Sequence, residues 1–467
     1  MKTKNLRHQH FILSFLLLFT FLLPQLAGAQ TTSTDSIPTL AKFLKKGKLN
    51  FHSRTYFMGT LNEGSSTDFF TIAQSLGVKY KTPAFYGFQI QAGGYLSMRL
   101  AEHNLIDENT GEWNKARYEK PLYDINNPNN HYNLGILDEV YLSYKHKNLS
   151  FKLGRQSYET PLMNKNYNRL RPNMFQGLSA KYKLNDFTVS GAWFISEAVR
   201  GTMRTYSMAN SFGVYGQGKN RNGEKHDYHN HISSLGVGVF GVQHELKNLK
   251  TQVWNYTAEN VFNMSFLQSD YRLEKDDLTY IIGGQGFYEY ALNHGGNKDQ
   301  TRTYICADEQ SFGFGGQLGI NVKDQHQFTA NYLAISDQGR FLFPREWGRE
   351  QFYASQTTEL FEGYGGLNAY VLRYRFQSKN KRHASIVSGG FVDQPGLDEV
   401  ELNKYQLADY YHFLIEHKYH FQKQLEGLSL RFIATYKTDF SKNEMSAAQK
   451  LNKVDMINLN LVLDYHL

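Results

Sequence analysis

The C-terminal end of the chain alternates in polarity, and this pattern restricts the folds that the chain can adopt. One set of positions is apolar, and the residues between them are polar except for Val462. The apolar set is Ile457, Leu459, Leu461, Leu463, Tyr465 and Leu467. A period of two residues is that of a β-strand with different surroundings on its two faces. Because about 9–11 residues suffice for a tilted strand to cross a bilayer, the pattern predicts a strand with lipid on one face and water on the other.

The same alternation recurs near the start of the chain, with Leu49, Phe51 and Phe57 on one face and His52 and Arg54 on the other. Further strands are predicted between these two. They lie near residues 69–82, 85–98, 136–146, 148–156, 176–184, 186–195, 234–246, 248–258, 261–271, 278–290, 311–322, 326–336, 364–377, 382–392, 409–421 and 426–438. With the two terminal strands the count is eighteen, and sixteen is the alternative. Strands at both ends favour a closed barrel, because the first and last strands can then pair.

The connections between the predicted strands alternate in length. Short turns are expected at Pro83, Lys147, Asn185, Lys247, Asp324, Asn380 and Gln422. Long loops are expected near residues 99–135, 157–175, 196–233, 291–310, 337–363, 393–408 and 439–454. Transmembrane barrels have short turns on the periplasmic side and long loops outside, whereas a soluble sandwich gives no reason for this asymmetry. The sequence therefore predicts an all-β fold, a transmembrane antiparallel β-barrel.

The N-terminal residues have the features of an export signal, with three bases before an apolar run and small residues at 27–29. We predict a signal peptide over residues 1–29 cleaved near Ala29, a periplasmic segment over 30–47 and the barrel over 48–467. The segment 30–47 contains either a short helix or a disordered tail. Removing three bases lowers the net charge from +8 to +5, which is too weak and too dispersed to favour nucleic acid as a partner. The single cysteine, Cys306, excludes an intramolecular disulfide.

The strand parity also predicts which charged side chains face the interior of the barrel. The expected inward bases are Arg54, Lys145, Lys152, Lys181, Lys183, Arg373, Arg375, Lys418, Arg431 and Lys437. The inward acids are fewer, chiefly Glu139, Glu289, Glu416 and Asp464. Arg373 and Arg375 are the most securely oriented, because arginine facing lipid would cost several kcal/mol. A basic interior favours solutes with carboxylate or phosphate groups, and simple solvation of the charges is the alternative.

One segment carries a resemblance to a known family. It contains Gly154-Arg155-Gln156, then Thr160-Pro161, then Arg169-Leu170-Arg171-Pro172, and finally Phe175-Gln176-Gly177 at the next strand. In this order the motifs resemble those of the outer-membrane porin D (OprD) family. The resemblance implies eighteen strands, a third loop that folds inward as a constriction, and solutes with a carboxylate, including amino acids, small peptides and organic acids. It makes Arg169 and Arg171 candidates for the constriction.

A further candidate lies in the seventh loop, where Arg345, Glu346 and Arg349 surround Trp347. These charges either contact solute or pin the loop through ion pairs, and the second role is favoured. His226, His229 and His231 lie in a polar loop without a cysteine or a carboxylate cage, so we expect solvated histidines and no metal site.

The hypothesis from sequence is an outer-membrane porin of a Gram-negative bacterium for passive, substrate-leaning diffusion of small polar solutes, without a cofactor and without enzymatic chemistry. The expected partners are small polar or anionic solutes, outer-membrane lipid and lipopolysaccharide, and the barrel-assembly machinery through the C-terminal strand. The oligomeric state stays open. The alternatives are a barrel-anchored adhesin or receptor and an outer-membrane lipid hydrolase, although no nucleophile motif is present.

Overall fold

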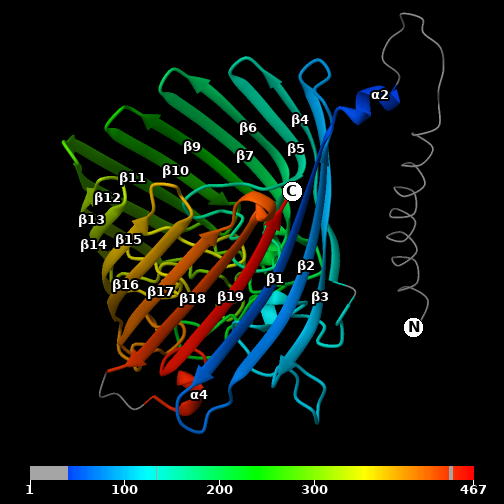
Figure 1. Cartoon of the computed structure of the whole chain (residues 1–467). Helices are drawn as coiled ribbons and strands as arrows, with labels where there is room; N and C mark the ends of the chain where they lie inside the picture. Colours follow the sequence, from blue (N-terminus) through cyan, green and yellow to red (C-terminus); the bar gives the residue numbers. More distant parts are fainter. Residues whose placement is uncertain (1–39, 133, 441–444) are drawn as a thin grey trace, which may run out of the picture.

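The computed structural model describes residues 40–132, 134–440 and 445–467. In Figure 1 tilted strands run side by side around a closed wall, and the first strand lies next to the last. The expected signal peptide, residues 1–29 with cleavage near Ala29, lies outside the described residues.

Eighteen antiparallel strands of the described chain form a closed barrel. They are β1 (Lys48–Asn62), β2 (Phe69–Lys81), β3 (Phe88–His103), β4 (Leu134–His146), β5 (Leu149–Gln156), β6 (Met174–Leu184), β7 (Phe187–Ala198), β9 (Val237–Glu245), β10 (Leu249–Ala258), β11 (Phe262–Lys275), β12 (Leu278–Ala291), β13 (Gln310–Val322), β14 (His326–Ile335), β15 (Asn368–Gln377), β16 (His383–Asp393), β17 (Tyr410–His420), β18 (Leu428–Asp439) and β19 (Met456–His466). A two-residue strand, β8 (Tyr206–Ser207), pairs with the end of β7 and lies outside the ring. Each strand predicted from the sequence is present, so the count of eighteen is confirmed over sixteen.

The ring closes where β1 pairs with β19, in a register that runs from His52 opposite His466 to Asn62 opposite Met456. The polarity pattern of the last strand follows this wall. Ile457 and Leu461 are exposed on the outside, whereas Asn458 and Asn460 are buried on the inside. Val462, the exception in the pattern, is buried inside as well. The predicted two-faced strand is therefore confirmed.

The connections differ between the two ends of the barrel. One end carries short turns, at 82–87, 147–148, 185–186, 246–248, 276–277, 323–325, 378–382 and 421–427. The opposite end carries loop 1 (63–68), loop 2 (104–133), loop 3 (157–173), loop 4 (199–236), loop 5 (259–261), loop 6 (292–309), loop 7 (336–367), loop 8 (394–409) and loop 9 (440–455). Most of these loops are long, so the expected asymmetry is present. The two ends are called the short-turn end and the long-loop end below.

Helices are few and short in the described residues. They are α2 (Leu40–Lys45), α3 (Met208–Ser211), α4 (Ala447–Lys450) and the 3-10 turns η1 (Lys120–Leu122) and η2 (Lys423–Leu425). No helix in this part of the chain is long and apolar enough to cross a membrane. Helix α2 falls in the segment for which a helix and a disordered tail were the alternatives. It rests against the short-turn end, where the Tyr80 hydroxyl donates to the Leu44 carbonyl at 2.5 Å.

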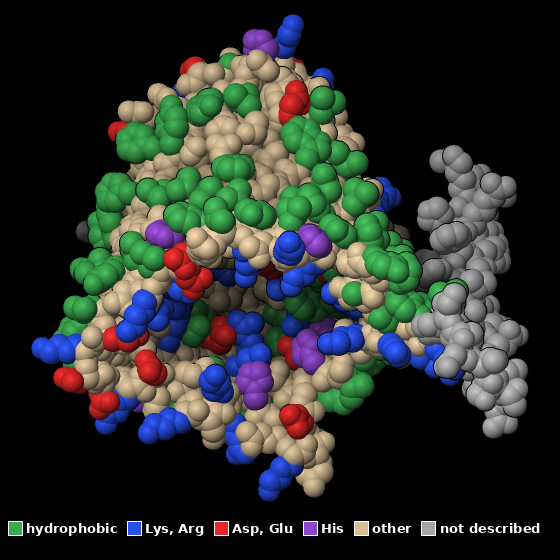
Figure 2. Space-filling view, turned by 90° about the horizontal axis from the view of Figure 1, so that it is seen from above, with side chains coloured by type: hydrophobic (Ala, Val, Ile, Leu, Met, Phe, Trp, Pro, Cys, Tyr) green, Lys and Arg blue, Asp and Glu red, His purple; other side chains and the backbone are tan. Residues whose placement is uncertain are grey.

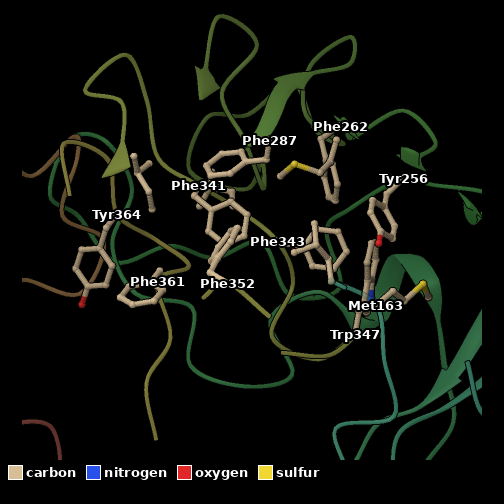
Figure 3. Packing of buried hydrophobic residues seen from close by; sticks show 14 of the residues in the cluster. Met163, Tyr256, Phe262, Phe287, Phe341, Phe343, Trp347, Phe352, Phe361 and Tyr364 are labelled. Carbon is tan, nitrogen blue, oxygen red and sulfur yellow. The ribbon is translucent and has the colours of Figure 1, made fainter. Parts of the chain in front are cut away.

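Loop 7 folds into the barrel and builds an apolar cluster there (Figure 3). Phe341, Phe343, Trp347 and Phe352 of this loop are buried among inward side chains of the wall, such as Phe287 of β12. The centroids of Phe287 and Phe341 are 4.9 Å apart, and those of Phe343 and Trp347 are 5.6 Å apart. The Trp347 indole N–H donates to Ser211 Oγ at 2.8 Å. Part of the interior is therefore packed like a protein core and closed to water.

We expect Trp347→Ala to lower the free energy of unfolding by about 3–5 kcal/mol, because the substitution removes a fully buried indole and leaves a cavity. Thermal unfolding in detergent micelles measures this loss. Trp193→Ala is the matched control, since Trp193 lies on β7 with 41% of its surface exposed on the outer face. Equal losses in the two variants would contradict the role assigned to the interior cluster.

Candidate functional site

A cavity of about 620 Å³ lies between the long loops, and we call it the vestibule. Its lining comes from loops 2, 3, 4, 7, 8 and 9. Among the described lining residues one is acidic, Glu359, and eight are basic. The bases are Lys115, Arg117, Lys120, Arg169, Arg200, Arg345, Arg349 and Lys453. Side chains from six loops thus converge on one strongly basic space.

Few of these bases are neutralised by a carboxylate in the described part of the chain. Arg345 pairs with Glu362, with Nε 3.5 Å from Oε2. Glu362 also accepts from Lys404 Nζ at 2.5 Å, so it is shared. Glu359 is engaged by wall residues, because it accepts from Lys437 Nζ at 3.0 Å and contacts His412 Nδ1 at 2.6 Å. The vestibule therefore carries an excess of positive charge.

Burial, with the crowding of like charges as a smaller cause, lowers the pKa of several of these bases. Burial, followed by the nearby Arg117, Arg345 and Lys115, lowers the pKa of Lys453 to about 8. Burial also lowers the pKa of Arg169 and of Arg349, and the charge of Arg200 adds to both shifts. Each base thus stands in a field that disfavours its own charge.

A smaller cavity of about 90 Å³, the inner cavity, lies next to the vestibule. The two share the lining residues Asn168, Arg169, Arg349 and Thr358, so they adjoin where loop 3 meets loop 7. Besides Tyr167 and Thr357 of the same two loops, the inner cavity is lined by the wall strands β1, β18 and β19, including Arg54, Arg431 and Asp464. The inner cavity therefore lies along the part of the wall where β1 pairs with β19 and closes the barrel.

The molecule is also hollowed at the short-turn end, as Figure 2 shows. Lys and Arg side chains gather in and around this hollow, together with some acidic and histidine side chains (Figure 2).

Arg54 of β1 holds loop 3 against the wall. Its Nε and Nη2 donate to the Asp464 carboxylate at 2.6 and 3.1 Å, and its Nη1 donates to the Arg169 carbonyl at 2.5 Å. The Tyr167 ring lies 4.2 Å from the Arg54 guanidinium, and the Tyr167 hydroxyl lies 2.8 Å from His52 Nδ1. One buried arginine thus fixes both the backbone and a side chain of loop 3.

Among the described residues, His52, Asp464 and His466 are the one group that could hold a metal ion, with ligand atoms within 4.8 Å of one another. The Asp464 carboxylate is already engaged by Arg54 and by His52 Nε2, the latter at 2.9 Å. The contacts present tie β1 to β19 and to loop 3.

The two arginines predicted for the constriction lie in different surroundings. Arg169 lines both the vestibule and the inner cavity. Arg171 is 2% exposed and lines neither cavity. Its guanidinium pairs with Asp138 at 3.0 Å and donates to the carbonyls of Val199 and Thr202. Arg171 thus joins loop 3 to β4 and loop 4.

The inward bases predicted from strand parity divide into three groups. Arg54, Arg431 and Lys437 pair with carboxylates, and both contacts of Arg431 to Glu416 measure 2.8 Å. Arg373 holds loop 7 by donating to the carbonyls of Tyr353 and Ser355, at 3.1 and 2.6 Å. A third group forms no ion pair within the described residues. It comprises Lys145, Lys152, Lys181, Lys183, Arg375 and Lys418, whereas the neighbouring acids Glu139 and Glu416 pair with Lys79 and Arg431.

The three charged residues predicted in loop 7 also differ. Arg345 donates to the Gly216 carbonyl at 2.5 Å, and Glu346 accepts from the Tyr215 amide at 2.7 Å, so both join loop 7 to loop 4. The guanidinium of Arg349 makes no hydrogen bond or ion pair within the described residues and borders both cavities. Arg345 and Glu346 therefore pin the loop, whereas Arg349 is open to solute.

The expectation of solvated histidines is wrong for His226. This side chain is 1% exposed, and burial together with Lys404 and Arg340 lowers its pKa to about 3. His229 Nδ1 lies 2.9 Å from the Phe212 carbonyl, and His231 lies 3.6 Å from Asp227. The three histidines thus have separate partners.

The vestibule contains bases that sequence reasoning missed. They are Lys115, Arg117, Lys120, Arg200 and Lys453. All five lie in loops, where no periodicity shows which way a side chain points. An excess of bases over acids in loop 4 could have indicated Arg200, whereas loop 2 contains more acids than bases and gives no such signal.

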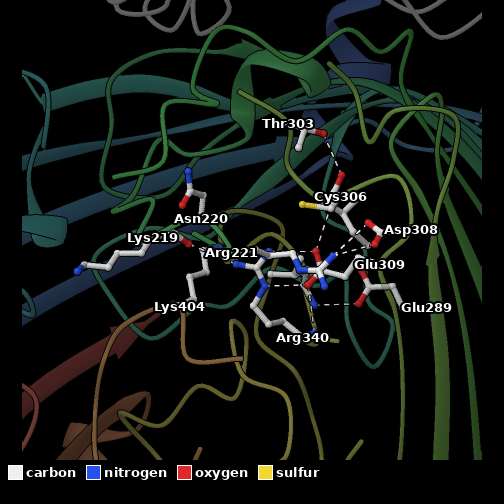
Figure 4. Close-up of polar contacts among 12 residues, drawn as sticks. Lys219, Asn220, Arg221, Glu289, Thr303, Cys306, Asp308, Glu309, Arg340 and Lys404 are labelled. Atoms are coloured by element: carbon white, nitrogen blue, oxygen red, sulfur yellow. Dashed lines mark hydrogen bonds and ion pairs between the residues drawn. The ribbon is translucent and has the colours of Figure 1, made fainter. Parts of the chain in front are cut away.

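Loop 7 is further fixed by a buried ion pair at the long-loop end (Figure 4). Arg340 Nε and Nη2 donate to the two carboxylate oxygens of Glu309 of loop 6, at 2.8 and 3.0 Å. Both side chains are almost fully buried. Arg340 also donates to the Lys219 carbonyl of loop 4 at 3.3 Å. Loops 4, 6 and 7 thus form one packed unit beside the vestibule.

No family model matches the sequence, and no curated protein matches it. Solved structures, however, match the fold over most of the chain. OccK9 (OpdG) of Pseudomonas aeruginosa superposes with a TM-score of 0.69 at 13% identity, covering 91% of this chain and 99% of that one. OpdK of the same organism, crystallised with vanillate, gives 0.66 at 13% identity over 91% and 99%. OccAB4 of Acinetobacter baumannii gives 0.67 at 13% identity over 90% and 98%.

The chain has the OprD-type porin fold. The OprD-type fold agrees with the resemblance drawn from the motifs around loop 3. At identities of 13% the structural similarity establishes the architecture alone. The role of each residue in this OprD-type barrel is therefore argued from the contacts that the residue makes in this structure.

We expect Arg340→Met to lower the free energy of unfolding by about 3–5 kcal/mol, because it leaves the Glu309 carboxylate buried without its partner. Arg221→Gln is the control, since Arg221 pairs with Asp308 at the surface, with 35% and 79% of the two side chains exposed. An exposed pair contributes about 0–1 kcal/mol. Denaturant titrations of the two variants in micelles decide the point, and an Arg340→Met variant as stable as the control would refute the structural role of the pair.

Proposed function

We propose that the protein is an outer-membrane porin for passive diffusion of small anionic solutes. The observation that carries this proposal is that two basic cavities adjoin each other and share Arg169 and Arg349 in their linings. The OprD-type fold supports the outer membrane as the location, with the long-loop end outside the cell and the short-turn end in the periplasm.

The proposed path needs no covalent chemistry. Clustered bases at the long-loop end raise the local concentration of anions. Arg169 and Arg349 then offer planar guanidinium groups at the narrow passage, where a carboxylate can be bound at two points. Binding must stay weak enough for the solute to leave, as in other selective channels. The wall bases Arg431 and Arg54 come next along the path.

Carboxylate-bearing solutes are the class that this chemistry fits best, and amino acids, small peptides and organic acids belong to it. OpdK, which shares the fold, has been crystallised with vanillate, a carboxylate. An adhesin would present its loops to the outside. Here loop 7 turns inward and is buried in the barrel, which favours a channel over an adhesin or receptor.

Purified protein in a planar bilayer is expected to give stepwise conductance with anion preference. We expect Arg169→Gln and Arg349→Gln each to shift the reversal potential in a salt gradient toward cations, because each removes a charge at the passage. Lys247→Gln, at an exposed turn of the short-turn end, is the control and keeps the wild-type value. Folded protein that gives no current steps would reject the porin proposal.

Anion preference is also expected to fall as the pH rises through about 8. Lys453, whose pKa burial and the neighbouring Arg117, Arg345 and Lys115 lower to about 8, is charged below this pH and neutral above it. Lys120 has a pKa lowered by burial and adds to the change. Reversal potentials at pH 6 and pH 9.5 measure the effect. Lys453→Arg should retain more anion preference at pH 9.5 than the wild type, and identical pH profiles would contradict the assignment to Lys453.

A further inference from the structure

We infer that the vestibule is a binding site for a multivalent oxyanion, a small solute with acidic groups at both ends, rather than for a monoanion. The solute class is that of short polycarboxylates and short-chain phosphates. This inference rests on the proposed porin function and adds to it the number of charges that the solute carries.

The inner group of bases lies at the passage to the inner cavity and consists of Arg169, Arg200 and Arg349. Where these arginines have hydrogen-bond partners among the described residues, the partners are uncharged. Arg200 donates to the Asn168 side-chain carbonyl, and Arg169 donates to the Asn168 backbone carbonyl at 2.9 Å. The charge of Arg200 acts on Arg169, and the charges of Arg200 and Arg169 act on Arg349. Three unneutralised arginines can bind one multiply charged group, or two carboxylates, through charge-assisted hydrogen bonds.

The outer group lies between loops 2 and 9 and consists of Lys115, Arg117 and Lys453. Loop 9 is tied to loop 2 because Asn452 Nδ2 donates to the Lys115 carbonyl at 2.6 Å. Lys453 donates weakly to the Tyr405 carbonyl at 3.4 Å, and Arg117 stacks 5.9 Å from Tyr118. The charges of Lys115 and Arg117 act on Lys453, so these bases are close enough to act together.

The charge balance favours more than one negative charge in the solute. The vestibule has eight bases, Glu359 belongs to its lining and Glu362 pairs with Arg345, so 8 − 2 = 6 positive charges remain. Repulsion between charges within a Debye length of about 8 Å is incompletely screened. A monoanion relieves little of this repulsion and meets one group, whereas an anion charged at both ends meets the inner and outer groups together. The volume of about 620 Å³ lies within the range of small-molecule sites.

The test is block of single-channel current by anions added at the long-loop side, at matched ionic strength. The probes are tricarballylate with three carboxylates, tripolyphosphate, and propionate as the monovalent reference. We expect half-block by at least one multivalent probe at a concentration roughly tenfold or more below that of propionate, since each added charge-assisted contact contributes about a factor of ten. Which multivalent probe blocks more tightly identifies a carboxylate or a phosphate solute.

Substitutions in each group separate the two contacts. Arg349→Gln in the inner group and Arg117→Gln in the outer group should each raise the half-block concentration of the multivalent probe roughly tenfold and change that of propionate less. Arg349→Lys keeps the charge and should lie between wild type and Arg349→Gln. Lys298→Gln, an exposed base of loop 6 outside the vestibule, is the matched control and should leave block unchanged.

The two proposals fail in different ways. Current steps with equal block by all three probes would overturn the inference and leave the porin function standing. Folded protein without current steps would reject the porin function, and calorimetric titration of tricarballylate and tripolyphosphate into the protein in micelles would then decide the inference by itself. If neither anion binds more tightly than propionate, the inference is overturned. If one of them binds more tightly and Arg117→Gln weakens that binding, the inference is supported.

Discussion

Backbone N–H and C=O groups inside a bilayer have no water to bind, and in the proposed outer-membrane location the architecture of this chain follows from that constraint. A sheet in hydrocarbon must close so that no edge is left unpaired. Here the pairing of β1 with β19 completes the ring. Because side chains alternate along a strand, closure assigns strand residues to an inner or an outer face, apart from the register shifts in the pairings β2–β3, β3–β4 and β6–β7. The inward position of Arg54 and Asp464 and the outward position of Leu461 and Leu463 are thus consequences of one geometric rule.

The interior is divided into two unlike halves. Loop 7 brings a set of aromatic side chains inward, and these pack against the inner faces of wall strands as the side chains of a soluble protein core would. Water is excluded from that half. The polar space is consequently found beside β1, β18 and β19, where the inner cavity lies. The apolar packing therefore shapes the path as much as the charges do, since it decides where charged side chains remain accessible.

The strands could be predicted from the sequence, because a period of two is a local property that needs no knowledge of distant contacts. The site could be predicted in part only. Arg169 and Arg171 are two residues apart in a loop, yet one borders the path and the other is buried against Asp138. No local pattern distinguishes them, since the difference arises from loop 4 and β4 packing on loop 3. His226 is a similar case, because burial and the charges of Lys404 and Arg340, which lie far away in the chain, together lower its pKa.

The lining of the inner cavity combines residues from the two extremes of the chain. Arg54 and Asp464 are 410 positions apart, and they meet across the last pair of strands to join. Contacts of such sequence separation are costly in loop-closure entropy and tend to form late. A chain interrupted before its final strand would therefore lack more than one segment of wall. It would also have no complete lining for the inner cavity, so that under the proposed function a finished polypeptide and an operative pore arise in the same step of assembly.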